Sequence, residues 1–138
     1  MKAETRADEA ERLLVELAPM LTESAEIPVI VAGDFNSPSH LDWRQDTASR
    51  HRGLVVDWPV SLAMEQAGFV DTYRTIHGSA LATSGFTWSP RFEDAWKDRI
   101  DFIYTHGEMT PLTAAVVDAH PPRWPSDHGA VSATLRLN

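Results

Sequence analysis

The stretch that decides the fold is Pro28-Val29-Ile30-Val31-Ala32-Gly33-Asp34-Phe35-Asn36-Ser37-Pro38. Its apolar run ends abruptly at Gly33, which predicts a buried strand with polar side chains at its end. Asp34 and Asn36 are two residues apart, so they share one face of an extended chain. A carboxylate and a carboxamide side by side can hold a divalent cation or position a water molecule. The alternative is a strand followed by an Asx-type turn that Ser37 and Pro38 close.

A second segment, Arg99-Ile100-Asp101-Phe102-Ile103-Tyr104, predicts another strand. Its alternation places Ile100, Phe102 and Tyr104 on one face and Arg99, Asp101 and Ile103 on the other. An acid in the middle of such a strand is costly to bury unless another group pairs with it. The segment therefore predicts a partner for Asp101.

A third segment, Trp124-Pro125-Ser126-Asp127-His128-Gly129, precedes an alternating strand from Ala130 to Leu137. It predicts a turn that presents Asp127 and His128 at the end of a sheet, with Gly129 allowing the backbone to pass close by. Asp101 is a suitable acceptor to fix the tautomer of His128. In the alternative interpretation, Asp101 pairs with Arg99 or Lys97, and His128 is an ordinary loop residue.

Together, Gly33-Asp34-Phe35-Asn36, Arg99-Ile100-Asp101-Phe102 and Ser126-Asp127-His128 resemble the endonuclease/exonuclease/phosphatase superfamily. Gly85-Phe86-Thr87-Trp88 also looks like the aromatic Thr-Trp segment of that family. The resemblance implies an α/β fold of the α+β kind, a four-layered α/β/β/α sandwich with mostly antiparallel sheets and flanking helices. It also implies hydrolysis of a phosphoester that depends on Mg²⁺ or Mn²⁺.

The resemblance assigns a role to each matching residue. Asp34 matches the aspartate that polarises the attacking water or helps to place the metal, and Asn36 matches the asparagine that holds the scissile phosphate and the metal shell. Asp101 matches the aspartate that orients the catalytic histidine, which His128 matches. Asp127 matches an acid that is a metal ligand in some members. We therefore expect Asp34, Asn36, Asp101 and His128 to be catalytic, and Asp34, Asn36 and Asp127 to bind the metal.

The chain departs from the family pattern at its start. In the family, an asparagine and the principal glutamate ligand come from strands well before the Gly-Asp-x-Asn segment. Here residues 1–33 predict an amphipathic helix, with Leu13, Leu14, Leu17 and Leu21 at helical spacing, and then a strand. We therefore expect residues 1–138 to be one partial domain, the C-terminal half of the sandwich without its N-terminal half.

A half of this kind would leave the inner face of its sheet uncovered. We expect that face to include Ile30, Phe102, Tyr104 and Val131. Such an apolar surface favours self-association or pairing with the absent half.

The middle of the chain predicts a long polar loop over residues 37–58, a helix from Pro59 to Gly68 and a short edge element over residues 69–73. Loops of this size near a site often carry specificity. His40, Trp43 and His51 in the loop either touch substrate or pack the loop. Trp88 and His40 are the candidates for lining the substrate site, with core packing as the alternative for the tryptophan.

Composition narrows the function classes. The 138 residues contain 20 acidic and 12 basic side chains, a net charge of −8, and the arginines are scattered. A small phosphoester or a lipid headgroup is therefore favoured as substrate over duplex DNA, whose binders carry a basic face. The sequence lacks cysteine, which excludes thiol nucleophiles and thiolate metal sites.

Two function classes stay open. The chain is either part of a metal-dependent phosphohydrolase, or a catalytically incomplete fragment or interaction module that keeps the fold. No secretory signal or membrane-spanning stretch is visible, so a cytoplasmic location is the default expectation. A truncated N-terminus would leave that location unknown.

Overall fold

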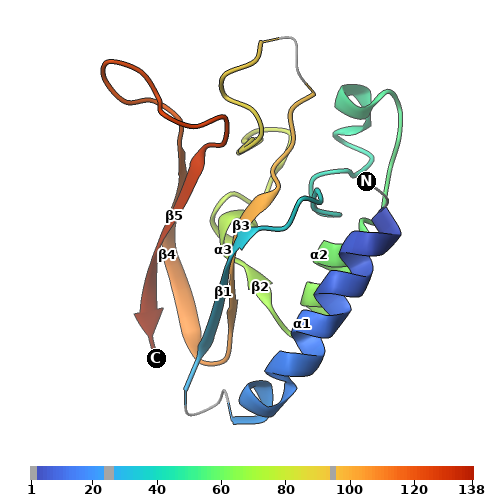
Figure 1. Ribbon diagram of the computed structural model, residues 1–138, viewed down its shortest axis with the longest axis vertical. Helices are drawn as coiled ribbons and strands as arrows, with labels where there is room; N and C mark the ends of the chain where they lie inside the picture. The colour runs from blue at the N-terminus through green and yellow to red at the C-terminus, as the bar shows by residue number, and fades with distance from the viewer. Residues whose placement is uncertain (1–2, 24–26, 94–95) are drawn as a thin grey trace.

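The computed structural model describes residues 3–23, 27–93 and 96–138. In chain order the elements are α1 (Ala3–Glu23), β1 (Val29–Asp34), the 3-10 turn η1 (Ala48–His51), α2 (Pro59–Gln66), β2 (Val70–Asp71), α3 (Thr72–Ile76), β3 (Asp101–His106), β4 (Met109–Val117) and β5 (Ala130–Leu137). Figure 1 shows α1 and α2 on one side of the central strands and the β4–β5 hairpin on the other.

The strands form two antiparallel sheets. The first has the order β1-β3-β2, and the second consists of β4 and β5. In the first sheet Asp34 faces Asp101, and Gly33 faces Phe102. The register therefore brings the last residue of β1 beside the first residue of β3, and two acids lie together at one end of the sheet. The predicted mostly antiparallel sheet with flanking helices is confirmed.

The core lies between this sheet and the helices α1 and α2. It centres on Met64, Phe69, Phe102 and Tyr104, and three of the four leucines of α1 expected at helical spacing, Leu14, Leu17 and Leu21, pack against it, whereas Leu13 lines a hollow beside β1. Burying one such side chain contributes roughly 1.5–3 kcal/mol. The amphipathic stripe predicted for the first helix is therefore confirmed as the face that packs on the core.

The expectation for the uncovered sheet face was wrong for two of its residues. Phe102 and Tyr104 are each 2% exposed and pack with Met64 on the helix side. They pair with Gly33 and Val31, so they share the helix-facing side of β1. Ile30 projects from the opposite face because side chains alternate along a strand, and it is 50% exposed.

Two elements were not predicted from the sequence. The edge element expected at residues 69–73 is β2 only over Val70–Asp71, after which α3 begins with Asp71 as its N-cap. The strand β4 contains Pro111, which cannot donate a ladder hydrogen bond, and its register shifts between Pro111 and Thr113. That irregularity weakens the alternating pattern by which a strand is found.

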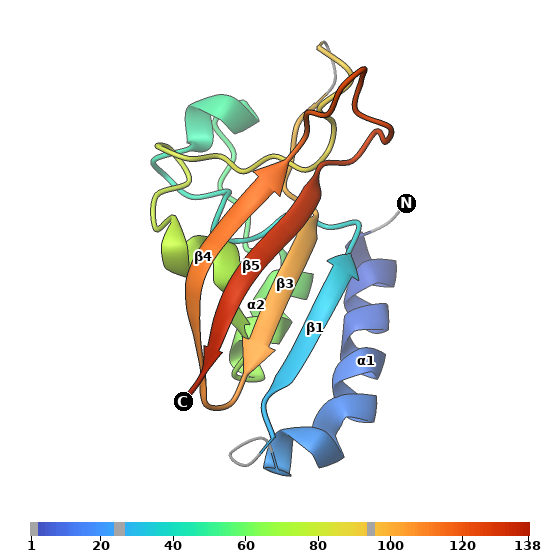
Figure 2. The same cartoon turned by 90° about the vertical axis from the view of Figure 1, so that its left-hand side faces the viewer.

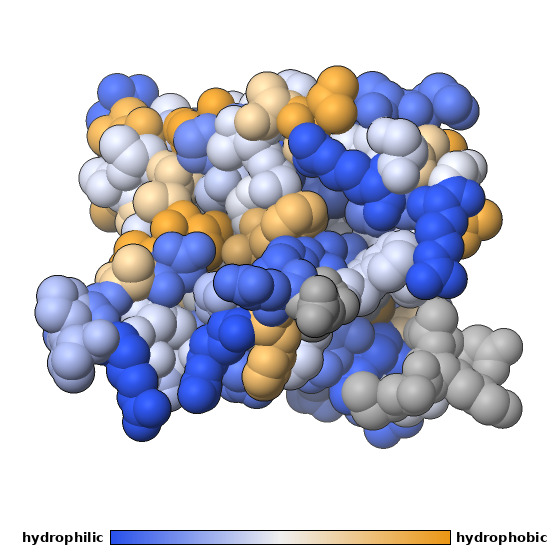
Figure 3. All heavy atoms as spheres, turned by 90° about the horizontal axis from the view of Figure 1, so that it is seen from above, coloured by the Kyte–Doolittle hydropathy of each residue, from blue (hydrophilic) through white to orange (hydrophobic). Residues whose placement is uncertain are grey.

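The loops that follow β1, precede β3 and join β4 to β5 meet at one end of the molecule. Figure 2 shows the arrow of β1 and the start of β3 at this end, with the β4–β5 connection beside them. Seen from that end in Figure 3, hydrophilic side chains dominate the surface, and hydrophobic ones form smaller clusters between them. Within the described part of the chain, no helix has both the length and the apolar character needed to cross a bilayer.

Candidate functional site at the end of the central sheet

Asp34 and Asn36 form a closed polar turn at the end of β1. The backbone N–H of Asn36 donates to Oδ1 of Asp34 over 2.7 Å, and its Nδ2 donates to Oδ2 over 2.9 Å. Asn36 has a φ of 48°, a left-handed conformation in which asparagine is enriched among non-glycine residues. The Asx-type turn and the shared polar face are therefore both present. The turn holds the Asp34 carboxylate in a single orientation at the sheet's end.

Asp101 and His128 form a hydrogen-bonded pair beside this turn. Oδ2 of Asp101 lies 2.9 Å from Nδ1 of His128, and both side chains are partly buried. Lys97 instead donates to the carbonyls of Ser89 and Phe92. The predicted pairing is confirmed, and the alternative in which Asp101 pairs with Arg99 or Lys97 is excluded.

The surroundings of His128 favour its charged form. Partial burial pulls the pKa of His128 down, but the hydrogen bond and charge of Asp101, together with the charges of Asp34 and Asp127, outweigh burial and raise this pKa. A raised pKa means that more of the imidazole is protonated near neutral pH, and the protonated ring is a strong donor to an anion.

Asp34, Asp101 and His128 converge closely enough to hold a metal ion. Each offers a ligand atom, and these atoms all lie within 4.8 Å of one another. Asp127 is not a member of this group among the described residues. Its charge acts on His128, while its backbone carbonyl accepts a hydrogen bond from Ser89. The structure thus brings Asp34, Asn36, Asp101 and His128 together and places Asp127 at their margin.

Thr87 connects the strand of Asp101 to the turn of His128. Its Oγ1 accepts the backbone N–H groups of Ile100 and Asp101 over 3.0 and 3.1 Å. Its carbonyl accepts the N–H of Gly129 over 2.7 Å. A Cβ on Gly129 would lie 2.8 Å from Cγ1 of Val116, so glycine at this position avoids a clash with the side chain of Val116 on β4. One fully buried threonine therefore sets the distance between the two segments that carry the acid–imidazole pair.

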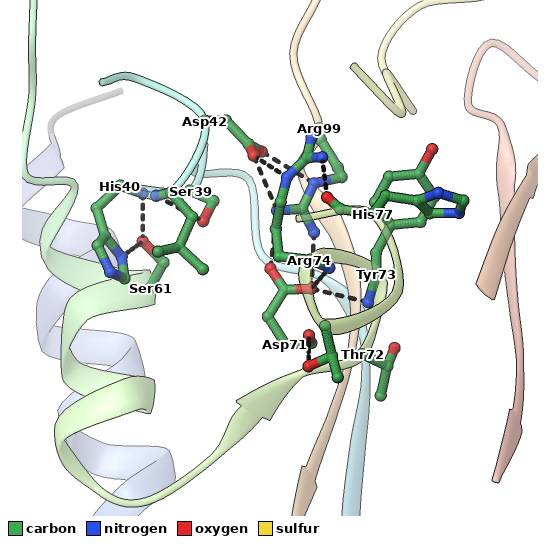
Figure 4. Close-up of polar contacts among 12 residues, drawn as sticks. Ser39, His40, Asp42, Ser61, Asp71, Thr72, Tyr73, Arg74, His77 and Arg99 are labelled. Atoms are coloured by element: carbon green, nitrogen blue, oxygen red, sulfur yellow. Dashed lines mark hydrogen bonds and ion pairs between the residues drawn. The ribbon is translucent and has the colours of Figure 1, made fainter. Parts of the chain in front are cut away.

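Arg99, expected beside Asp101 in the alternative interpretation, is instead the centre of a buried ionic network (Figure 4). It is 1% exposed and donates to Asp42 over 2.9 and 3.2 Å and to Asp71 over 3.0 and 2.7 Å. Burial alone would lower the pKa of Arg99, but the charges and hydrogen bonds of Asp71 and Asp42 raise it. Arg74 binds Asp42 as well, and its other nitrogens donate to the carbonyls of His77, Thr83 and Ser84.

This network was missed in the sequence because its charged members come from three separate segments with no common spacing. Within this network Arg99, two residues before Asp101, binds Asp42 and Asp71. Asp101 is thereby left to bind His128.

The two predicted substrate-lining residues lie in different places. His40 contacts α2, with Nδ1 2.8 Å from Oγ of Ser61 and Nε2 2.9 Å from Glu65 (Figure 4 labels the first pair). Both ring nitrogens are engaged, so His40 attaches the loop to α2. The ring of Trp88 lies 4.9 Å from that of His128, edge to face. Trp88 therefore adjoins the site, and His40 does not.

Beside Trp88 and Asn36 lies a hollow of about 370 Å³. Its lining includes four tryptophans, Trp43, Trp58, Trp88 and Trp96, together with Asp98. The predicted polar loop thus contributes Trp43 to this wall. His51 is stacked on Trp43 with a 3.9 Å centroid distance and is 3% exposed, which is loop packing.

Comparison with known proteins agrees with the geometry. The family described as the Endonuclease/Exonuclease/phosphatase family matches residues 3–128. This chain belongs to the endonuclease/exonuclease/phosphatase family. The turn of Asp34 and Asn36 and the pair of Asp101 and His128 both lie within the matched range.

The relatives that this chain matches are longer than the chain itself. It is similar to the uncharacterized protein F14F9.5 of Caenorhabditis elegans, with 35% identity over 127 residues, 78% of this chain and 40% of the relative. A conserved protein of unknown function from Enterococcus faecalis V583 superposes with a TM-score of 0.67 and 20% identity, over 100% of this chain and 46% of that one.

The 3′ phosphatase NExo from Neisseria, solved with a product DNA hairpin, superposes with a TM-score of 0.61 and 20% identity, over 92% of this chain and 53% of that one. The chain therefore spans about half the length of the proteins it resembles. The likeness to solved structures confirms the α/β class of the fold.

Proposed function

We propose that the chain is part of a divalent-metal-dependent phosphoester hydrolase whose reacting groups are Asp34, Asn36, Asp101 and His128. Hydrolase chemistry on phosphoesters is the activity of the family to which the chain belongs. The observation that carries the proposal for these residues is the hydrogen bond between Asp101 and His128 next to the Asp34 carboxylate. An oriented, cationic imidazole beside a fixed carboxylate suits attack by water on an anionic phosphorus centre.

Each side chain has a distinct task in this proposal. The Asp34 carboxylate, held by Asn36, takes a proton from the attacking water, and general base catalysis of this kind typically contributes 10²–10⁴-fold. Asp101 occupies Nδ1 of His128, so Nε2 is the ring nitrogen left to donate to a phosphoryl oxygen. This charged donor gains strength as negative charge builds up on that oxygen.

The donor atoms fit a hard cation such as Mg²⁺ or Mn²⁺. Asp34 offers carboxylate oxygens, and Nδ2 of Asn36 donates to Asp34, so its Oδ1 is left to act as a ligand. His128 must lose its proton to bind metal, and the raised pKa of His128 opposes that loss. We therefore assign the cation to the oxygens of Asp34 and Asn36, with Asp127 as a further ligand. When bound, the cation would supply charge stabilisation worth several kcal/mol.

The proposed substrate is a small phosphoester or a lipid headgroup. The net charge of −8 disfavours a long duplex, because phosphate contacts need clustered basic side chains. The relative from Neisseria was solved with DNA, and that finding concerns that protein. Assays of phosphomonoesters and phosphodiesters with Mg²⁺ and Mn²⁺ should show turnover of small substrates first. Plasmid nicking as the preferred activity would overturn this choice.

The decisive variant is His128→Ala, with His120→Ala as its matched control. His120 is an exposed histidine in the connection between β4 and β5. In an active preparation, His128→Ala should lower kcat far more than it raises KM, since the bond of His128 strengthens only as charge develops. His120→Ala should leave both constants unchanged. An unchanged kcat in His128→Ala would remove this residue from the reaction.

The second candidate function is a catalytically incomplete interaction module. It is favoured by the short ligand set, since Asp34, Asn36 and Asp127 provide only part of the near-octahedral shell that Mg²⁺ demands. We expect the 138-residue chain alone to bind Mg²⁺ weakly, to turn over slowly and to self-associate or pair with a complementary half. Calorimetric Mg²⁺ titration and light scattering measure these properties. Tight Mg²⁺ binding with rapid turnover by a monomer would contradict the expected weak Mg²⁺ binding. It would also contradict the interpretation of the chain as a catalytically incomplete interaction module.

A further inference from the structure

The peptide unit that precedes His128 is bound on both of its sides. Its carbonyl, which belongs to Asp127, accepts the hydroxyl of Ser89 over 2.8 Å. Its N–H, which belongs to His128, donates to Oγ of Ser126 over 3.0 Å. Because a peptide unit is planar, bonds on opposite sides of it fix the orientation of the whole unit. The backbone that enters His128 is therefore held in place.

The peptide unit that follows His128 is bound in the same way. Its N–H, on Gly129, donates to the carbonyl of Thr87 over 2.7 Å. Its carbonyl, on His128 itself, accepts the indole Nε1–H of Trp124 over 2.6 Å. Both peptide units that flank the Cα of His128 are thus fixed, and with them the direction in which the imidazole leaves the backbone.

The four groups that hold these units come from two parts of the fold. Ser89 and Thr87, in the segment before β3, are 1% and 0% exposed. Ser126 and Trp124 belong to the connection between β4 and β5, which Figure 2 shows beside the start of β3. In that connection residues 118–123 are all exposed, and Trp124 is the first partly buried residue after them. Trp124 therefore attaches the exposed part of the connection to the backbone of the site.

The alignment of the imidazole depends on this backbone. Nδ1 of His128 lies 2.9 Å from Oδ2 of Asp101, and a carboxylate only accepts, so Nδ1 is the donor. Hydrogen bonds weaken steeply as their angle departs from linearity. The side chain of His128 is 28% exposed, so packing around the ring leaves it room to turn. A backbone held at both peptide units limits that turning.

An indole is a suitable group to hold the carbonyl of His128. It carries one N–H donor at a fixed place on a rigid ring, and it offers no competing acceptor. The hydroxyl of Ser126, in contrast, rotates and can donate or accept. Phenylalanine at position 124 would keep an aromatic ring and remove the N–H, so the hydrogen bond and the packing of the ring can be tested separately.

We infer that Trp124 is a positioning residue for the proposed reaction: its Nε1–H holds the carbonyl of His128 and thereby keeps Nδ1 aligned on Asp101. Trp124 acts through His128 and donates to its backbone, not to a reacting atom. The inference rests on the proposed function, since the reaction is what the alignment serves. The alignment itself is a property of the folded chain and can be measured without turnover.

The tautomer of His128 gives a direct test on the intact chain. At a pH high enough to make the ring neutral, the ¹⁵N NMR shifts of its two nitrogens show which one carries the proton. We expect the proton on Nδ1 in the unaltered chain. In Trp124→Phe part of it should move to Nε2, because the bond to Asp101 is formed for less of the time. A proton on Nε2 in the unaltered chain, or the same tautomer in both chains, would overturn the inference.

Amide hydrogen exchange tests the hold on the peptide unit after His128. Trp124→Phe should speed the exchange of the Gly129 N–H by roughly 5- to 10-fold, about the effect of losing one ordinary hydrogen bond. Trp124→Ala should speed it at least as much. If Trp124→Phe exchanges at the unaltered rate and only Trp124→Ala is faster, the packing of the ring holds the turn and the role of the N–H is refuted.

Trp96→Phe is the matched control for Trp124→Phe. It makes the same substitution at a tryptophan of a neighbouring loop whose ring lies by Trp43 and Arg52. We expect Trp96→Phe to leave the tautomer of His128 and the exchange of the Gly129 N–H unchanged. An equal effect of the two variants would mean a general loosening of the loops, and it would overturn the specific role of Trp124.

Turnover separates this inference from the proposed function. In an active preparation, Trp124→Phe should lower kcat by roughly 5- to 10-fold with little change in KM, because the donor it aligns matters most as charge builds up on the phosphoryl oxygen. A shifted tautomer in Trp124→Phe, with no phosphoester turnover by the unaltered chain, would refute the proposed hydrolase and keep the positioning role. Turnover at the unaltered kcat in Trp124→Phe would refute the positioning role and keep the hydrolase.

Discussion

The carboxylate of Asp101, the first residue of β3, lies 2.9 Å from Nδ1 of His128 in the turn before β5. The two residues are 27 positions apart in the chain. Two features of the packing support this pairing: Thr87 binds the backbone on both sides of it, and Arg99 is bound by Asp42 and Asp71 instead of Asp101. The acid–imidazole pair is thus a product of packing around it.

Asp101→Asn should lower the pKa of His128, because the variant removes the negative charge that raises it and leaves a neutral amide oxygen, a weaker acceptor, in place of the carboxylate. In the unaltered chain, the folded-state pKa of His128 lies above 6.5, so the pair stabilises the fold fully below pH 6.5. That stabilisation disappears as pH rises through the folded-state pKa. NMR titration of the imidazole measures the change. Asp57→Asn changes an exposed acid in a loop and is the control. It should leave the pKa of His128 unchanged.

Thr87→Val should destabilise the fold by about 1–3 kcal/mol, because the N–H groups of Ile100 and Asp101 lose their shared buried acceptor. Thr87→Ser keeps the hydroxyl oxygen and should retain most of the stability. Urea unfolding of the two variants gives the difference in the free energy of unfolding. If Thr87→Val and Thr87→Ser lower the free energy of unfolding equally, the hydroxyl does not bind these N–H groups.

Arg99→Met should cost about 3–5 kcal/mol in the free energy of unfolding, because it leaves the carboxylates of Asp42 and Asp71 buried beside an apolar side chain. Arg12→Met replaces an exposed arginine of α1 and should change stability by no more than about 0.5 kcal/mol. Denaturant unfolding checks both variants. A neutral Arg99→Met would show that the buried network does not stabilise the fold.

Asp98→Asn should remove a pH dependence of stability. Burial raises the pKa of Asp98 from 3.8 to about 6, against the lowering effect of hydrogen bonds from Trp43 and Trp96. Between these values the folded chain binds the proton more tightly than the unfolded chain, so stability falls as pH rises from about 4 to about 6. Asp98→Asn should not show this fall. The unfolding free energy of the unaltered chain minus that of Asp98→Asn should therefore decrease as pH rises from about 4 to about 6. A pH-independent difference would place the pKa of Asp98 near its ordinary value.

The sequence alone determined the local parts of the site. The apolar run ending in Gly33-Asp34-Phe35-Asn36 specified a strand and a polar turn, because alternation and asparagine's tolerance of left-handed backbone are properties of neighbouring residues. The leucine spacing of α1 specified its buried face for the same reason. Chemical need indicated that Asp101 requires a partner, but the sequence left His128, Arg99 and Lys97 all open as that partner.

Tertiary structure decided which partner each charge received and which face of the sheet was covered. Arg99 pairs with Asp42 and Asp71, and Phe102 and Tyr104 face the helices; both outcomes depend on how segments far apart in the chain pack and pair. The aromatic hollow likewise joins Trp43 and Trp58 to Trp88, Trp96 and Asp98 across a long separation in the chain. Contacts of this kind leave no periodic signal, because their geometry exists only after the sheet and the loops have packed together.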